Sequence, residues 1–126
     1  LKMLGFVEDL TPYYESCKLA IAPLRYGAGV KGKVNQALSY GLPVVGSPDA
    51  VEGMGLTHGR EVMVAETAEG FAGSIAKVCN NRALWQALSE KGSASLVNRF
   101  TPEVAEEALR HALAPWLDER DLEAVG

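Results

Sequence analysis

Residues 19–46 read LAIAPLRYGAGVKGKVNQALSYGLPVVG, and this stretch decides the fold. It opens with a short apolar run at 19–22 and closes with another at 43–46. Short apolar runs bounded by proline or glycine are typical of strands that are buried on both faces of a sheet. A helical pattern separates the two runs, so we expect two parallel strands joined by a right-handed crossover.

The crossover helix is expected at 33–39, and Gly41 follows it where a glycine commonly ends a helix. The segment from Arg25 to Lys33 is rich in glycine and is expected to be a loop at the carboxyl end of the first strand, where parallel sheets bind ligands. One face of the helix carries apolar side chains at helical spacing: Val34, Ala37 and Leu38.

The alternation of strand and helix continues on both sides of this stretch. Residues 4–7 predict the end of a strand, and residues 61–64 predict another. Between the strands expected at 4–7 and 19–22, a helix is expected to start with Thr11 as its cap and Pro12 in its first turn. Strands that alternate with helices predict an α/β fold, a Rossmann-like parallel sheet flanked by helices.

From Thr67 onward the pattern is helical. Two helices are expected first, and a cap at Thr101 followed by Pro102 predicts the start of a third. We expect a single partial domain over 1–117 and a frayed, charged tail over 118–126. The apolar faces of the three helices carry Phe71, Ile75 and Val78, then Leu84, Trp85 and Leu88, and finally Val104, Ala108 and Leu109.

Composition narrows the class of protein. The chain has 126 residues and a net charge of -4, so it lacks the dominant basic face that binding to nucleic acid or anionic membranes needs. No apolar run is long enough to span a bilayer. Cys17 and Cys79 have no cysteine or histidine partner at metal-binding spacing, which indicates two buried, reduced thiols, as in a cytoplasmic protein. His58 is expected to be a surface histidine in a loop. Trp85 and Trp116 are expected to pack against apolar neighbours rather than to bind a sugar.

The glycine-rich segment GAGVKGKV at 27–34 matches two phosphate-binding templates. It fits G-x-G-x-x-G and nearly fits the P-loop, and both place backbone N–H groups against phosphates at a helix N-terminus. The P-loop assignment fails because Val34 has no hydroxyl to hold Mg²⁺. The dinucleotide assignment gains Asp49 as a ribose-binding acid, but residues 23–26 separate the strand from the glycines.

Taken without reference to any protein family, the residues of this segment indicate an anion-binding site. Glycine lets a backbone approach a ligand closely, and Lys31 and Lys33 add positive charge beside a helix N-terminus. A phosphate group is the expected ligand. The structural alternative is a tight turn with two solvated lysines.

The stretch from Ile21 to Val45 resembles the group 1 (family 4) glycosyltransferases, as do residues 4–10 and 59–64. The resemblance runs from about Gly5 to Phe100. It implies a GT-B fold of two Rossmann-like domains, in which this domain binds a nucleotide-diphosphate sugar as substrate. It also implies sugar transfer with retained anomeric configuration, without a metal or other cofactor. The donor-binding residues it implies are Gly27, Ala28, Gly29, Val30, Lys31, Lys33 and Gln36.

The chain departs from the family pattern at two positions. Many members carry two glutamates seven residues apart, of which the second reaches the ribose and the first lies near the donor sugar. Here Gln36 stands at the second position and Ala28 at the first. Three hypotheses follow: a donor-binding part of a retaining glycosyltransferase, a nucleotide-binding module of an NAD(P)-dependent oxidoreductase, and a pseudo-transferase without activity.

The expected partners follow from the same resemblance. The chain starts at Leu1, which we interpret as a cut from a longer chain whose N-terminal domain binds the acceptor. On its own the chain is expected to fold, to be inactive, and to associate with itself through an unpaired sheet edge.

Overall fold

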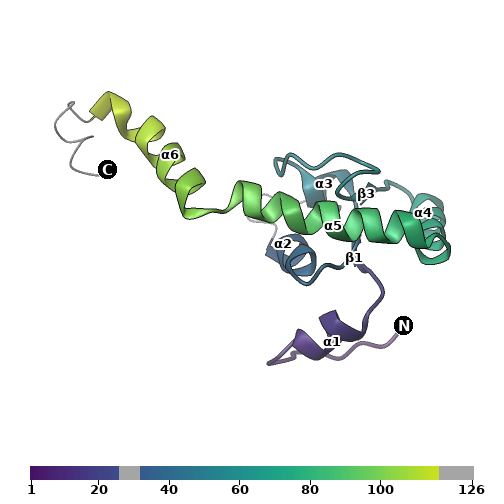
Figure 1. Ribbon diagram of the computed structural model, residues 1–126. Helices are drawn as coiled ribbons and strands as arrows, with labels where there is room; N and C mark the ends of the chain where they lie inside the picture. Colours follow the sequence, from purple (N-terminus) through teal and green to yellow (C-terminus); the bar gives the residue numbers. More distant parts are fainter. Residues whose placement is uncertain (26–31, 117–126) are drawn as a thin grey trace. The chain divides into compact units, whose positions relative to one another are not determined.

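The computed structural model describes residues 1–25 and 32–116, which divide into two compact units, Leu1–Ser95 and Leu96–Gly126 (Figure 1). The first unit contains a parallel sheet and most of the helices. In chain order its elements are α1 (Thr11–Ser16), β1 (Ala20–Ala22), α2 (Gly32–Ser39), β2 (Val44–Gly46), α3 (Pro48–Val51), β3 (Met63–Val64), α4 (Ala68–Asn80) and α5 (Arg82–Arg99), the last of which continues into the second unit.

The sheet has three parallel strands in the order β1-β2-β3. Ile21 is opposite Val45, and Val45 is opposite Met63. The α/β class, the parallel pairing and the helix between the first two strands are therefore confirmed. The strand expected at 4–7 is wrong, because this segment pairs with no strand among the described residues and Phe6 is fully exposed.

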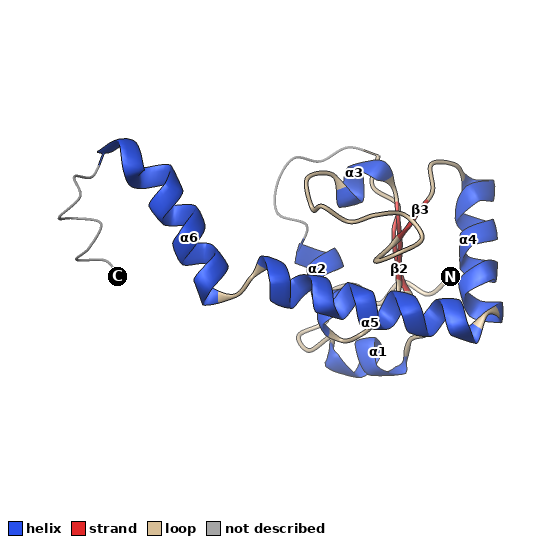
Figure 2. Ribbon diagram, turned by 45° about the horizontal axis from the view of Figure 1, so that its top comes forward, coloured by secondary structure: helices blue, strands red, loops and turns tan. Residues whose placement is uncertain are grey.

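Helices cover the sheet from both sides, with α2 and α4 on opposite faces (Figure 2). The predicted apolar face of α2 is confirmed, since Val34, Ala37 and Leu38 are all buried. Gly41 ends this helix with a φ of 73°, a left-handed conformation that glycine adopts without strain.

The hydrophobic core forms where β2 and β3 meet α4 and α5. A buried cluster joins Val45 and Met63 of the sheet to Val78 of α4 and Leu88 of α5. Phe71, Ile75, Leu84 and Trp85 pack against it, as their helical spacing predicts.

The first part of α5 runs across the amino ends of the strands (Figure 2). Trp85 Nε1 donates at 2.7 Å to the carbonyl oxygen of Lys18, a residue that precedes β1 in the chain. Ser89 Oγ donates at 2.6 Å to the carbonyl oxygen of Gly41, which precedes β2. Gly92 lies close to the carbonyl of Glu61, before β3. The amino ends are thus closed, so the opposite, carboxyl ends are the edge at which a ligand can bind.

β1 is less buried than its sequence predicts. Ala20 and Ala22 are half-buried and Ile21 is 54% exposed, so burial on both faces is wrong for this strand. The physical reason is position, because β1 is the edge of the sheet and α4 packs on β2 and β3.

The start of α1 also differs from the prediction. The N-cap residue is Leu10, which makes no side-chain cap, so Thr11 is not the cap. Instead the Thr11 amide donates to Asp9 Oδ1 at 3.0 Å. The backbone hydrogen bond, and then the side-chain hydrogen bond, from Thr11 lower the pKa of the Asp9 carboxyl.

The second unit contains α6 (Pro102–Leu113), followed by a 3₁₀ turn (Ala114–Trp116). Thr101 caps α6 as predicted, since its Oγ1 accepts from the Val104 amide at 3.2 Å. The tail at 118–126 lies outside the described residues. Leu109 and Trp116 are exposed in this unit, so the apolar face of α6 is not buried there and the packing expected of Trp116 is not found.

Candidate ligand-binding site

The carboxyl edge of the sheet is built from the segments that follow its strands. A cleft of about 780 Å³ opens at this edge. Residues after each of the three strands line it, and the first turns of α4 form one wall. The lining residues are Ile21, Pro23, Leu24, Arg25, Ser47, Pro48, Asp49, Glu66, Thr67, Ala68, Phe71, Ala72 and Ile75.

Ser47 ties the ends of β1 and β2 together. It is 7% exposed, and its Oγ donates to the Leu24 carbonyl oxygen at 2.5 Å. The same oxygen caps α3 by accepting from the Ala50 amide at 3.3 Å, and the Ser47 amide donates to the Ala22 carbonyl oxygen at 3.0 Å. These bonds hold the floor of the cleft in one arrangement.

The edge near β3 is held by two further side chains. Thr67 caps α4, its Oγ1 accepting from the Gly70 amide at 3.0 Å. His58 Nδ1 accepts from the Val64 amide at 2.8 Å. His58 thus has a structural role in this exposed loop, as a partner for the backbone of β3.

Three helices of the described residues begin at this edge, and their charges differ. The partial positive charge at a helix N-terminus attracts anions, but an acidic side chain in the first turn already offsets that charge. Asp49 stands in the first turn of α3 and Glu69 in that of α4. α2 has no acid there and carries Lys33 instead. The start of α2 is therefore the helix N-terminus that best suits a phosphate.

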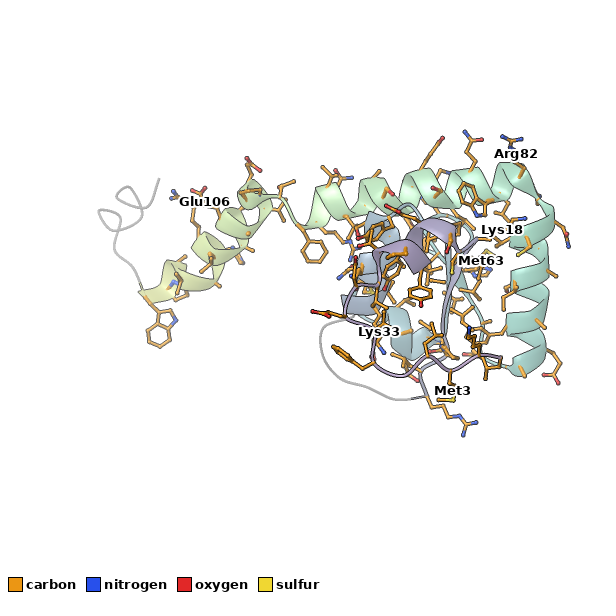
Figure 3. All side chains as sticks on the ribbon, turned by 90° about the horizontal axis from the view of Figure 1, so that it is seen from below. Met3, Lys18, Lys33, Met63, Arg82 and Glu106 are labelled. Carbon is orange, nitrogen blue, oxygen red and sulfur yellow. The ribbon has the colours of Figure 1, made fainter. Side chains whose placement is uncertain are left out.

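The structure places two of the predicted donor-binding residues. Lys33 and Gln36 are exposed on α2, one turn apart. Neither lines the cleft. In Figure 3, Lys33 lies apart from Lys18 and Arg82, and the Lys18 ammonium donates to the Cys79 carbonyl oxygen at 2.8 Å. Gly27, Ala28, Gly29, Val30 and Lys31 lie outside the described residues.

Gln36 has a partner that the sequence pattern did not indicate. Its Oε1 accepts from the Tyr14 hydroxyl at 3.4 Å, which joins α2 to α1. Tyr14 also stacks on Tyr40, with ring centroids 4.9 Å apart and planes 3° from parallel.

Some of the residues that line the cleft could be expected from the sequence, and others could not. Asp49, the ribose-binding acid of the dinucleotide alternative, lines the cleft, and so does Arg25 at the start of the glycine-rich segment. Ser47 and Thr67 were not identified from the sequence as the N-caps of α3 and α4. The signal for Ser47 was available, because Ser47-Pro48 repeats the cap-plus-proline pattern of Thr101-Pro102.

The described residues contain neither a metal-ligand cluster nor a helix that could span a membrane, and Cys17 is exposed rather than buried as expected. Over residues 1–25 and 32–116, no group of three or more acidic, histidine or cysteine side chains could hold a metal ion. Across the same ranges, every helix is too short or too polar to cross a lipid bilayer.

Comparison with known proteins identifies the family. A family model for the group 1 glycosyl transferases matches residues 1–81, which include all three strands and every residue that lines the cleft. No curated protein matches the chain. Because the family model covers more than half of the sequence, the chain belongs to the group 1 glycosyltransferases.

Proposed function

We propose that this chain binds a nucleotide-diphosphate sugar and is the donor-binding part of a retaining glycosyltransferase. The observation that carries the proposal is the start of α2, a helix N-terminus with a lysine and no acid in its first turn. A diphosphate is a strong hydrogen-bond acceptor, so this helix start suits it better than those of α3 and α4.

The glycine-rich segment supports the same ligand from the sequence. Its glycines leave room for a phosphate to approach the backbone, and Lys31 lies two residues before Lys33 in the chain. In this proposal Gly27, Ala28, Gly29 and Val30 supply amides, and the two lysines supply charge.

Gln36 is proposed to meet the ribose of the donor. It replaces the glutamate of many family members, so its bond to a hydroxyl lacks the assistance of a charge. The acceptor is proposed to bind another domain of a longer chain, in the cytoplasm. A sugar transfer needs both substrates held in one cleft, so this chain alone is expected to be inactive.

A binding experiment tests the proposal. UDP, GDP, ADP and NAD are titrated separately against ¹⁵N-labelled protein, and chemical shifts are followed at millimolar ligand. We expect a nucleoside diphosphate to shift amides at the start of α2. The double change Lys31→Ala with Lys33→Ala should weaken binding by about 1–3 kcal/mol, because it removes hydrogen bonds to a charged group.

The matched control is Lys77→Ala with Lys91→Ala, which removes the same charge from exposed positions on α4 and α5. It should leave the affinity unchanged. Equal affinity in the wild type and the Lys31/Lys33 variant would reject the diphosphate site. Tighter binding of NAD would favour the oxidoreductase alternative, in which Asp49 at the cleft meets a ribose.

The third hypothesis, a pseudo-transferase, is favoured by Ala28 and Gln36. It is separated from the first by assaying sugar transfer in a chain that carries both domains. Transfer there supports an enzyme, and donor binding without transfer supports the pseudo-transferase.

A further inference from the structure

The Gln36 side chain is exposed, yet one of its polar atoms is already engaged. Its Oε1 accepts from the hydroxyl of Tyr14, at 3.4 Å, across the contact between α1 and α2. Tyr14 itself is held in place, since its ring stacks on Tyr40 and the Tyr40 hydroxyl lies 3.0 Å from Thr11 Oγ1. The direction in which Tyr14 points its hydroxyl is thus set by packing and not by solvent.

Because the two ends of an amide differ chemically, the contact with Tyr14 fixes which way the Gln36 amide faces. A glutamine side chain has one oxygen that accepts and one NH₂ group that donates twice. A tyrosine hydroxyl that donates to Oε1 holds that oxygen toward α1. The Nε2 group then lies on the other side of the amide, and it makes no hydrogen bond within residues 1–25 and 32–116.

We infer that Tyr14 is a positioning residue, which fixes the Gln36 amide so that Nε2 faces the donor. The inference rests on the proposed function. It adds that Gln36 acts as a hydrogen-bond donor, so the atom it meets is an acceptor oxygen of the ribose or of the diphosphate. A glutamate at this position can only accept. The glutamine therefore changes the direction of the hydrogen bond and not only its strength.

Removing the hydroxyl alone tests the positioning. Tyr14→Phe keeps the aromatic ring and its stack on Tyr40 but cannot donate to Gln36. The matched control is Tyr13→Phe, the neighbouring tyrosine on α1, whose hydroxyl makes no hydrogen bond within residues 1–25 and 32–116.

The first measurement needs no ligand. The side-chain NH₂ resonances of Gln36 are assigned by their loss in Gln36→Ala, and their order is measured by ¹⁵N relaxation. We expect Tyr14→Phe to make this group more mobile and to move its shifts, while Tyr13→Phe leaves both unchanged. Unchanged mobility in Tyr14→Phe would overturn the inference.

The second measurement uses the nucleoside diphosphate, among UDP, GDP and ADP, that binds most tightly. Tyr14→Phe should weaken its binding by about 2- to 12-fold, the range of a neutral hydrogen bond. The same change made in Gln36→Ala should have no further effect, because there is no amide left to position. Equal losses in both backgrounds would mean that Tyr14 acts only through the fold and would overturn the inference.

A third variant checks the direction of the hydrogen bond. In Gln36→Glu the Tyr14 hydroxyl donates to a carboxylate, but the carboxylate has no group that donates to the ligand. If Nε2 meets an acceptor oxygen, Gln36→Glu binds more weakly than the wild type. Tighter binding of Gln36→Glu would instead place a hydroxyl donor of the ligand at this position and would overturn the donor role.

The outcome for Gln36→Ala separates this inference from the proposed function. If Gln36→Ala leaves the affinity unchanged, the proposed contact between Gln36 and the donor fails, and the inference fails with it. If Gln36→Ala weakens binding and Tyr14→Phe does not, the inference alone fails.

Discussion

β1 and β2 look alike in the sequence but differ in the structure. Both are short apolar runs, and each is followed by a polar or proline-containing segment at the same edge of the sheet. All three residues of β2 are buried, whereas Ile21 at the centre of β1 is 54% exposed. The two strands are hydrogen-bonded neighbours, so backbone pairing does not explain the difference.

Position in the sheet explains it. β2 is the middle strand, and both α2 and α4 pack on it. Among the described strands β1 has one neighbour, and α4 reaches it only far enough to form a wall of the cleft. An apolar run therefore predicts a strand, whereas the burial of that strand depends on which helices and strands pack around it.

The largest difference between the two strands is expected in stability. Val45→Ala removes a fully buried side chain of β2 and should lower the free energy of unfolding by about 2–3 kcal/mol. Ile21→Ala removes a larger but half-exposed side chain of β1 and should cost less than about 1 kcal/mol. Urea denaturation measures both. Equal costs would contradict the difference in burial.

The next effect is on association. The Ala20 amide and the Ala22 carbonyl bond toward β2, so the backbone groups of Ile21 face away from it. An edge that pairs with no other described strand favours contact between copies, and we expect dimers or larger species at high concentration. Ile21→Lys should weaken this association at least about tenfold, or about 1.4 kcal/mol.

Analytical ultracentrifugation over a range of concentrations measures this association. Val97→Lys, at an exposed apolar position in the second unit, is the control and should associate like the wild type. A wild-type chain that stays monomeric at the highest concentration would refute the expectation.

A smaller effect is expected where the two strands are tied together. Ser47→Ala removes both the cap of α3 and the bond to the Leu24 carbonyl oxygen. The free energy of unfolding should fall by about 0.5–2 kcal/mol, the usual cost of a lost cap. Hydrogen exchange should rise at Ala50, whose amide loses its acceptor. Ser16→Ala, which removes only an exposed hydrogen bond of 3.4 Å to the Tyr13 carbonyl oxygen, is the control and should change both quantities less.

The smallest effect concerns pH and the helix that precedes β1. Hydrogen bonds from Thr11 lower the pKa of Asp9 in the folded chain. The ionised carboxylate therefore contributes stability above its pKa in the unfolded chain, and this contribution disappears as the pH falls through the lower, folded value. A titration of the Thr11 amide shift should give a midpoint below the usual value of an aspartate, about 4. Asp9→Asn should abolish the titration.

Much of the fold could be predicted because it depends on neighbours in the chain. The period of Val34, Ala37 and Leu38 is enough to predict the buried face of α2, and Gly41 is enough to predict its end. Runs of apolar residues predict the strands, and caps such as Thr101 predict helix starts. Glycines, a lysine and a helix start also indicate an anion site before any contact is known, because each acts through its local backbone and charge.

Tertiary structure alone decided the features that depend on residues far apart in the sequence. Residues 4–7 have the composition of a strand, but a strand also needs a neighbour to pair with, and the described residues supply none. In the sequence, Ser89 and Gly92 look like ordinary helix residues. In the structure α5 crosses the amino ends of the strands at these positions, where small side chains allow so close an approach. The contact between Tyr14 and Gln36 spans 22 residues. No local pattern encodes it, because it arises only when α1 and α2 pack together.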